Sequence, residues 1–376
     1  MNTDKNEVIL ETDEPPSSNL KWNDWRWQLR NSIYDIFKLS KIFRFSKTQL
    51  ENLSKVVIKY PFAITPYYLS LIDKDNPADP IRMQCVPSEE EDKLYFDIQD
   101  DPLGEEKDSV LPGLVHRYPD RVLIILTNMC PVYCRHCTRK REWCRGKWVR
   151  TQKELESIYD YINRHKEIRD VIISGGDPFI LSTERIEEVL RKLRAISHVE
   201  IIRIGTRCPV VLPQRIDDEL VSMLKKYRPL WLNAHFNHPN EITKESSIAC
   251  DRIVCAGIPV NNQSVLLKGI NNDVETMTKL CQGLLKIGVR PYYLFQCDPV
   301  VGTGHLRTSI EKGLEIIKGM RGFTSGLAVP IFVVDGLEGQ GKVPLQPPDY
   351  LVALEKNYAI LKGYKGESFK YYNPEG

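Results

Sequence analysis

The chain has 376 residues, of which 42% are hydrophobic and 27% are charged, and its formal net charge is +2. This composition is typical of a globular protein with a full core, and the small net charge gives no basis for a nucleic-acid-binding surface. No apolar run is long enough to span a bilayer and the N-terminus lacks the apolar core of a signal peptide, so we expect a cytoplasmic protein without a membrane partner.

The N-terminal part of the chain divides into a tail and a helical region. Residues 1–20 are polar and acidic and are predicted to be disordered, and residues 21–100 are predicted to be helical. The apolar residues at helical spacing in the first stretch of this region are Trp25, Leu29, Ile33 and Ile36. The acidic run at 89–92 is typical of a solvated loop.

From about residue 120, short apolar runs alternate with stretches of helical periodicity. The runs cover residues 121–127, 170–176, 199–206, 230–236, 260–267, 290–296 and 329–335. Two intervening helices are predicted to open with a capping box, formed by Thr151 with Glu154 and by Thr308 with Glu311. Strands that recur roughly every 30–40 residues with helices between them predict an α/β fold with a parallel sheet. Six or seven such units indicate a full or partial TIM-type barrel over residues 101–328, followed by a C-terminal segment at 329–376.

Polar residues stand where the apolar runs end. They are Cys130, residues 174–178, residues 205–207, residues 235–238, Gln263, Ser264, Cys297, Asp298 and Asp335. Because a parallel barrel carries its chemistry at the carboxyl ends of its strands, these residues are expected to converge on one site.

Three cysteines, Cys130, Cys134 and Cys137, lie in a CxxxCxxC spacing directly after the first run. In a reducing cytoplasm the ten cysteines of the chain favour a metal site over disulfides. A structural zinc site would need a fourth ligand, for which His136 and Cys144 are candidates. The interpretation we favour is a 4Fe–4S cluster held by three thiolates, with one iron left open for a substrate or cofactor.

The cysteine loop after the first strand of a βα barrel resembles that of the radical S-adenosylmethionine (SAM) enzymes, which implies a partial (β/α)6 barrel. In that superfamily the open iron binds SAM, and an electron from the cluster cleaves SAM to methionine and a 5′-deoxyadenosyl radical. The segment SGGDP at 174–178 is similar to the glycine-rich element of the superfamily. The SAM contacts that the resemblance implies are Gly175, Gly176, Asp177 and His235.

Longer motifs resemble the lysine 2,3-aminomutase family over most of the chain, from about Trp22 to beyond Lys342. They are ITPYYLSLID, PGLVHRYPDRV, CRHCTRKR, PVVLPQRI, HFNHPNEIT, RPYYLFQCD, GLEIIKGMRG, PIFVVDG and GKVPL. The resemblance implies an isomerase that converts L-lysine to β-lysine by 1,2-amino migration, with pyridoxal 5′-phosphate (PLP) beside SAM.

In this family a lysine holds PLP as a Schiff base, and the matching residue is Lys342 in the segment DGLEGQGKVP. Without the family, a lysine in a glycine-rich loop would be interpreted as an exposed turn residue. The loop departs from the all-glycine run of the family at Leu337, Glu338 and Gln340. The residues that match contacts for the PLP phosphate are Arg117, Arg121 and Gln263, with Asp101 as an acidic residue near the arginine cluster.

The resemblance also implies the substrate contacts. Arg139 matches the arginine that binds the α-carboxylate, and Asp298 and Asp335 match the positions that bind the ε-ammonium of lysine. In the glutamate-using relatives these two positions are not acidic, so lysine is favoured as substrate. Glutamate, arginine, ornithine and a lysyl residue of a translation factor stay open as alternatives. Lys140 and Arg141, which follow Arg139, are given no role and are expected to be solvated.

One feature of the family's zinc-binding members is missing from the chain. No cysteine follows Cys297, and Asp273 stands at the position of their mid-chain zinc ligand. We therefore predict no zinc, and a homodimer is favoured because the extension that holds the family's tetramer together is missing. The other expected partners are a small amino-acid substrate and an electron donor such as flavodoxin or ferredoxin.

Overall fold

Residues 21–374 are described by the computed structural model, so the tail predicted at residues 1–20 lies outside the described residues. The described chain forms a ten-stranded sheet in the order β1 to β10 and a separate three-stranded sheet. The strands of the large sheet are β1 (Ser109–Leu111), β2 (Leu114–Tyr118), β3 (Arg121–Ile125), β4 (Asp170–Ser174), β5 (Ile201–Gly205), β6 (Leu230–Ala234), β7 (Val260–Leu266), β8 (Val289–Gln296), β9 (Ile331–Gly336) and β10 (Gly341–Leu345).

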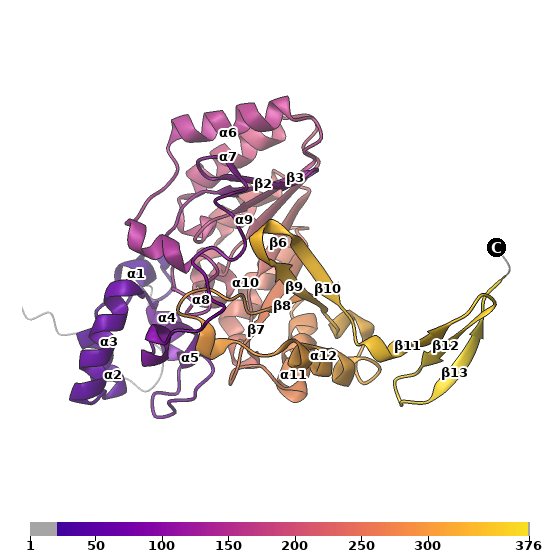
Figure 1. Cartoon of the computed structure of the whole chain (residues 1–376). Coiled ribbons are helices and arrows are strands. Elements are labelled where there is room, and N and C mark those ends of the chain that lie inside the picture. Colours follow the sequence, from indigo (N-terminus) through magenta and orange to yellow (C-terminus); the bar gives the residue numbers. More distant parts are fainter. Residues whose placement is uncertain (1–20, 375–376) are drawn as a thin grey trace, which may run out of the picture.

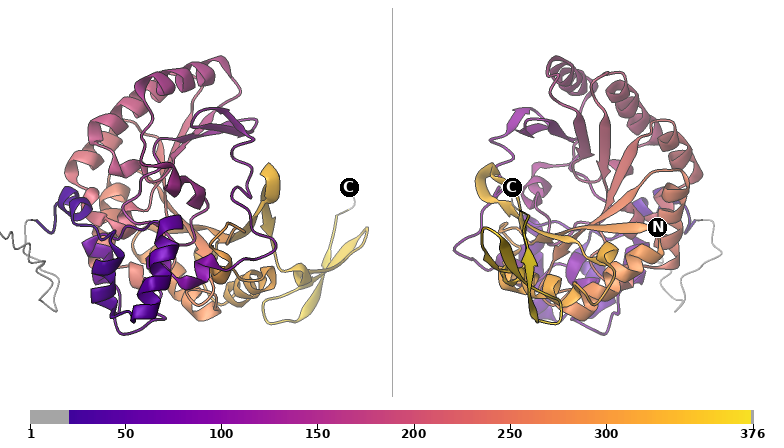
Figure 2. Two further views of the ribbon diagram at one scale, coloured as in Figure 1. Left: turned by 60° about the vertical axis from the view of Figure 1, so that its left-hand side comes forward. Right: turned by 90° about the vertical axis from the view of Figure 1, so that its right-hand side faces the viewer.

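The large sheet is a partial barrel. Strands β3 to β9 are parallel, while antiparallel pairs add β1 and β2 at one end and β10 at the other. Within the described residues β1 and β10 are the two edges, so the sheet curves without closing on itself (Figure 2). The seven predicted runs are strands β3 to β9, which confirms the α/β fold. Strands β1 and β2 were not predicted, because Pro112 and Gly113 interrupt their short sequence.

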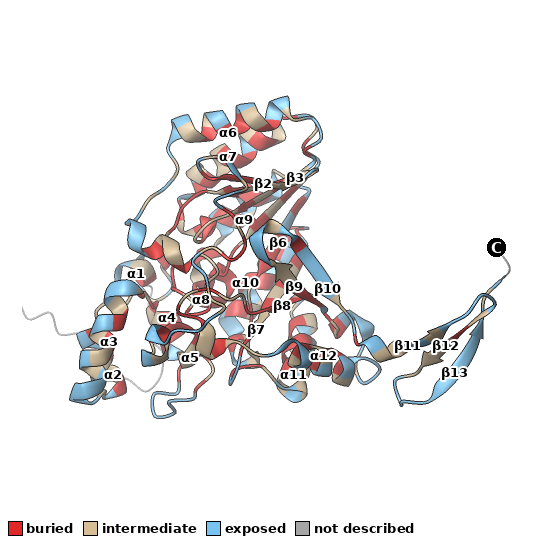
Figure 3. Cartoon of the chain, in the orientation of Figure 1, coloured by how far each residue is buried: buried red, intermediate tan, exposed pale blue. Residues whose placement is uncertain are grey.

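Helices follow the parallel strands and pack on the outer side of the curved sheet (Figures 1 and 2). They are α6 (Gln152–Arg164), α7 (Thr183–Arg194), α8 (Cys208–Val211), α9 (Asp218–Lys225), α10 (Lys244–Cys255), α11 (Val274–Lys286) and α12 (Ile310–Met320). Apart from the short α8, whose four residues are all buried, these helices bury their apolar faces in the core and expose the opposite faces (Figure 3). The capping box predicted for α6 is confirmed, since Thr151 and Glu154 each bind the other's backbone N–H.

The capping box predicted for α12 is wrong. This helix begins one residue later than expected, after Ser309, whose hydroxyl accepts a hydrogen bond from the Lys312 N–H. Thr308 is used elsewhere, because its carbonyl oxygen accepts a hydrogen bond from Gln296 Nε2 at 2.6 Å. Ile310, the first residue of the helix, is 41% exposed.

The N-terminal region is helical as predicted, but its first periodic stretch is broken. Its helices are α1 (Trp25–Arg30), α2 (Ile36–Phe43), α3 (Lys47–Lys59), α4 (Pro66–Ser70) and α5 (Arg82–Cys85). Ile33 lies between α1 and α2 and forms an isolated antiparallel bridge with Ile64. Asp35 caps α2 by accepting a hydrogen bond from the Phe37 N–H, so the helix restarts there.

The acidic run at 89–92 is not a solvated loop. It forms a short 3-10 helix, η1 (Glu89–Asp92), capped by Ser88. Glu91 is buried, and its carboxylate contacts Arg135 and Lys140. The local sequence could not indicate this, because both cations come from the cysteine loop more than 40 residues later.

The C-terminal part of the chain begins inside the large sheet and ends outside it. Strand β10 pairs antiparallel with β9, which places Lys342 opposite Asp335. Strands β11 (Leu351–Leu354), β12 (Tyr358–Lys362) and β13 (Ser368–Tyr372) form the small sheet, which projects from the body as an arm (Figure 1). Among the described helices, none has the length and apolar character needed to cross a membrane.

Candidate active site

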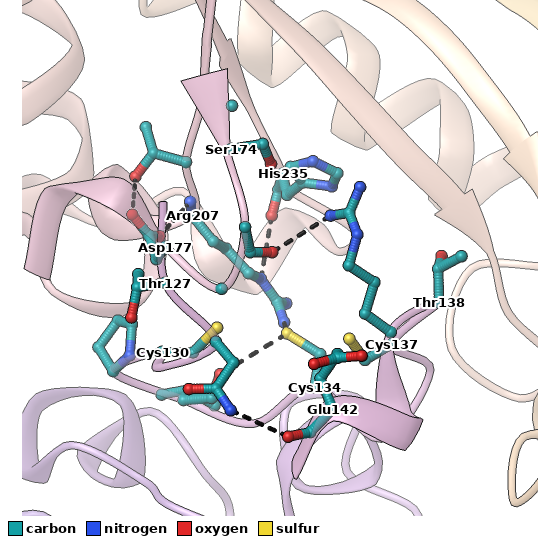
Figure 4. Close-up of a pocket in the computed structure, with 18 of the residues that line it drawn as sticks. Thr127, Cys130, Cys134, Cys137, Thr138, Glu142, Ser174, Asp177, Arg207 and His235 are labelled. Carbon is teal, nitrogen blue, oxygen red and sulfur yellow. Dashed lines mark hydrogen bonds between the residues drawn. The ribbon is translucent and has the colours of Figure 1, made fainter. Parts of the chain in front are cut away.

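The three cysteines of the CxxxCxxC motif lie in the loop after β3 and line one cavity of about 180 Å³ (Figure 4). The loop after β4 and the ends of β5 and β6 line the same cavity, so the first four predicted strand ends converge as expected. Three thiols on the wall of one cavity are a donor set that fits a 4Fe–4S cluster with one iron left open.

The two residues that could complete a structural zinc site have other partners. The Nε2 of His136 lies 3.4 Å from the side-chain nitrogen of Asn237, and the Cys144 thiol donates to the Lys59 carbonyl oxygen at 2.7 Å. In the described part of the chain, no three His, Cys, Asp or Glu side chains are placed to hold one metal ion.

A buried ion triad anchors the cysteine loop. Arg135, between the second and third cysteines, donates to both carboxylate oxygens of Glu91 and to the backbone carbonyls of Tyr60 and Pro61. Lys140 Nζ lies 2.6 Å from the same carboxylate. Burial opposes charge on Glu91, but the two cations outweigh it and hold the pKa of Glu91 below its usual value. The expectation that Lys140 is solvated is wrong, since its side chain is 1% exposed.

A second ion network holds Arg139, the predicted carboxylate-binding residue. Its Nε and Nη2 donate to the two oxygens of Glu105 at 2.9 and 2.6 Å, and its Nη1 donates to the Gly175 carbonyl oxygen at 3.2 Å. Arg141 is not solvated either, because it forms ion pairs with Glu105 and Asp101. Asp101 therefore faces Arg141, and the carboxylate that pairs with Arg117 belongs to a residue the sequence did not single out, Asp108.

The glycine-rich segment packs directly on the cysteine loop. A Cβ atom at Gly176 would lie 2.1 Å from the Met129 carbonyl oxygen, and one at Gly175 would lie 2.4 Å from that of Thr127. The backbone N–H groups of Gly176 and Asp177 donate to these two carbonyls. Glycine is required here because no side chain fits between the two backbones.

Asp177 and His235, two predicted SAM contacts, both line the cavity. The carboxylate of Asp177 accepts hydrogen bonds from the Thr206 hydroxyl at 2.7 Å and from the Arg207 N–H at 2.7 Å. It therefore connects the glycine-rich segment to the loop after β5. Burial, and then the charges of Arg207 and Arg139, lower the pKa of His235 to about 4. Its imidazole is therefore neutral at pH 7.

Lys342 extends from β10 toward the end of β9. Its Nζ lies 2.7 Å from Asp335 Oδ1 and 4.6 Å from the centre of the Phe295 ring. Its backbone N–H donates to the Tyr118 hydroxyl at 3.0 Å. Strand β2 thus holds the segment that carries the lysine, although the two are more than 200 residues apart in the chain.

Asp298 follows β8 and belongs to the same group of charges. Its Oδ2 accepts a hydrogen bond from the Thr138 hydroxyl at 3.0 Å, which connects it to the residue after Cys137. Burial raises the pKa of Asp298 to about 7, and the charge of Asp335 adds to the rise. Two carboxylates, Asp298 and Asp335, therefore share this site with the single ammonium group of Lys342.

Of the residues that match PLP phosphate contacts, Arg117 lies beside the loop between Asp335 and Lys342. Arg117 donates to Asp108 at 2.6 Å and to the Leu103 carbonyl oxygen, and a Cβ at Gly339 would lie 3.5 Å from its Nε. Arg117 is therefore close to the loop that leads to Lys342, and a cation beside this loop suits a phosphate-bearing cofactor.

The other two phosphate matches are placed by neighbours on β2, β3 and β8. Arg121 stacks on the Tyr118 ring at 3.8 Å and pairs with Asp120. Gln263 lies on β7, beside Tyr293 of β8. The loop between Asp335 and Lys342 adopts a left-handed conformation at Glu338, where φ is 53°.

Known proteins resemble the chain across this whole site. Residues 124–281 match the model of the Radical SAM superfamily, and residues 317–376 match the model described as Lysine-2,3-aminomutase. The L-lysine 2,3-aminomutases of Acetoanaerobium sticklandii and Clostridium subterminale are each 50% identical, over 94% and 95% of this chain and 85% and 86% of theirs. The glutamate 2,3-aminomutase of Clostridioides difficile is 45% identical over 93% of this chain and 82% of its own.

Proposed function

Since the chain belongs to the lysine 2,3-aminomutase family, we propose that it is an isomerase that converts L-lysine to β-lysine by moving the amino group from Cα to Cβ. The observation that carries the choice of substrate is the carboxylate pair beside Lys342. Asp298 and Asp335 lie at the carboxyl ends of neighbouring parallel strands. The ammonium group of Lys342 already donates a hydrogen bond to Asp335.

Two acidic groups in one half-buried site favour a cationic side chain. Burial, and then the charge of Asp335, raises the pKa of Asp298, so a cation placed between the two carboxylates would stabilise the ionised pair. The ε-ammonium of L-lysine would supply that charge, whereas the side-chain carboxylate of glutamate would add a third negative charge. Once the amine of Lys342 is engaged with a cofactor, Asp335 is free to bind the substrate cation instead.

Arg139 is suited to the other end of the substrate. A guanidinium carries five N–H donors, and Glu105 and Gly175 use three of them. The two that remain match the two oxygens of an α-carboxylate. Glu105 fixes the orientation of Arg139, so the substrate would be held between a cation on one side and a carboxylate pair on the other.

The same residues are assigned to the cofactors. We propose that Cys130, Cys134 and Cys137 hold a 4Fe–4S cluster, that Gly175, Gly176, Asp177 and His235 contact SAM, and that Lys342, Arg117, Arg121 and Gln263 hold PLP. The cofactors would supply the radical and the electron sink, while the chain binds, orients and encloses the reactants. We propose no zinc.

Anaerobic turnover tests the proposal. Purified protein reconstituted with iron and sulfide is given SAM, PLP, a reductant and L-lysine, and the products are separated on a chiral column. The expected result is β-lysine, with no turnover of L-glutamate. Turnover of glutamate but not lysine would contradict the substrate assignment. L-Arginine, L-ornithine and a translation factor carrying the target lysyl residue are assayed in parallel.

The proposed partners follow from the same chemistry. Reduction of the cluster needs a one-electron donor such as flavodoxin or ferredoxin, and free thiols suit the cytoplasm. A homo-oligomer, most simply a dimer, is proposed because the β11–β13 arm carries exposed apolar side chains that a partner subunit would cover. These side chains are Leu351, Val352, Leu354, Phe369, Tyr371 and Tyr372.

A further inference from the structure

Arg207 has no role in the proposed reaction, yet its guanidinium lies against one of the three cysteines. Its Nη1 donates a hydrogen bond to Cys134 Sγ at 2.6 Å (Figure 4). The sulfur atom stands here for the thiolate that would bind iron. The contact places a permanent positive charge and an N–H donor at one ligand of the proposed cluster.

The position of Arg207 is set by several buried partners rather than by the sulfur. Its Nη2 donates to Glu241 at 2.8 Å, to the Tyr68 hydroxyl at 3.1 Å and to Gln84 at 2.5 Å. Its Nε donates to the His235 carbonyl oxygen at 3.2 Å.

Glu241 is itself fully buried and fixed. Its carboxylate accepts from the backbone N–H groups of Asn237 and His238 and from the Tyr68 hydroxyl. The guanidinium of Arg207 is therefore held in place whether or not the sulfur is present, and its Nη1 is aimed at Cys134.

We propose that Arg207 raises the reduction potential of the cluster through its hydrogen bond to Cys134. Reduction adds one electron, supplied by the low-potential donor, and no proton, so the negative charge on the cluster and its thiolates increases. A fixed cation and N–H donor at a ligand sulfur stabilises that extra charge, and hydrogen bonds to the sulfurs are among the factors that set Fe–S potentials. Arg207 acts through Cys134 and is a positioning residue. The inference rests on the proposed cluster.

The charges around Arg207 predict shifts of the reduction potential in opposite directions for two variants. Removing the cation should make reduction harder, whereas removing the negative charge of Glu241 should make it easier. A general disturbance of the loop would not give opposite signs in the two variants. Arg203 offers a control, because it lies on β5 just before the loop that carries Arg207 and pairs with Asp170 instead.

The experiment is an EPR-monitored redox titration of the reconstituted protein without SAM, after iron and sulfide have been measured. In Arg207→Gln we expect the ratio of reduced to oxidised cluster at a fixed potential to fall about tenfold, which is about 59 mV for one electron. Glu241→Gln should shift the midpoint in the opposite direction, and Arg203→Gln should leave it unchanged. Arg207→Lys, which keeps the charge, should lie between wild type and Arg207→Gln.

An unchanged midpoint in Arg207→Gln, or shifts of the same sign in the Arg207 and Glu241 variants, would overturn the inference. So would a loss of SAM affinity with an unchanged midpoint, which would place Arg207 at SAM instead. If Arg207→Gln takes up no cluster, the directions of the midpoint shifts in Glu241→Gln and Arg207→Lys decide whether the inference holds. Wild-type protein without iron and sulfide would instead refute the proposed function.

Discussion

At the scale of single residues, we expect the affinity for the substrate to depend on the protonation state of Asp298. Its pKa lies at about 7 because the carboxyl is buried and Asp335 is close, while Thr138 and Lys342 act in the opposite direction. A cationic substrate binds the ionised form. Binding should therefore be strongest above pH 7 and weaken as the pH falls through 7 and the carboxylate is protonated.

This reasoning gives a prediction for Asp298→Asn. The variant loses one charge-assisted contact to the ε-ammonium, which costs about 2–5 kcal/mol, so kcat/KM for L-lysine should fall roughly 30-fold or more. The rise of kcat/KM between pH 6 and 8 should also disappear, as measured by initial rates in anaerobic buffers. Asp349→Asn, which affects a carboxylate paired with Lys318 near the arm, should keep the wild-type profile. A wild-type profile in Asp298→Asn would contradict the assignment.

At the scale of elements, the site depends on loops that lie against one another with no space between their backbones. The glycine-rich loop after β4 touches the cysteine loop after β3, and the triad of Glu91, Arg135 and Lys140 joins η1 to the same cysteine loop. The cysteines are therefore positioned from two sides by segments far from them in sequence.

Gly176→Ala tests the first of these contacts. The added methyl group would meet the Met129 carbonyl oxygen at 2.1 Å, so the two loops must separate. We expect a lower iron content after reconstitution and SAM affinity reduced about tenfold, or about 1.4 kcal/mol, measured by iron analysis and equilibrium dialysis. Gly326→Ala is the matched control, because a Cβ there meets nothing within 4 Å. Equal cluster content and SAM affinity in both variants would refute the argument.

Glu91→Gln tests the second contact. The substitution leaves two buried cations without their counter-charge, which should destabilise the fold by about 3–5 kcal/mol in urea unfolding under anaerobic conditions. Glu90→Gln changes the neighbouring residue, whose side chain is half-exposed and pairs with Lys93, and should shift stability by less than about 1 kcal/mol. A similar loss of stability in both variants would show that burial of Glu91 is not the cause.

At the scale of the whole molecule, the arm is the part that the body leaves uncovered. Its attachment is slight, through the Phe323–Tyr364 ring contact and the ion pairs of Asp349 with Lys318 and Lys362. Its exposed apolar side chains form a surface of the kind that a protein partner covers.

A double variant, Leu354→Glu with Phe369→Glu, tests the proposed oligomer. Two carboxylates placed in an apolar interface would be desolvated without partners, so the mass measured by light scattering after gel filtration should fall toward that of one chain. Lys356→Glu, at an exposed turn of the same arm, should keep the wild-type mass. A wild-type protein that already elutes as one chain would refute the proposal.

The features that were predictable from the sequence are those that depend on residues close together in the chain. The seven parallel strands were predictable because each contains a short run rich in apolar residues, and such runs are a local property of the chain. The cysteine spacing and the motifs around Lys342 were also local, and they led to the fold and to the family. The α12 cap was missed because Thr308 and Ser309 are both good caps, and a tertiary contact of Thr308 decided between them.

The sequence by itself determined the seven parallel strands, the three cysteines and the family to which they belong. Only the tertiary structure decided the partners of the charged side chains: Glu91 for Lys140, Glu105 for Arg139, and Cys134 for Arg207. The physical reason is range. Hydrophobic periodicity acts between near neighbours in the chain, whereas a buried charge takes its partner from whatever segment the fold brings within hydrogen-bond distance.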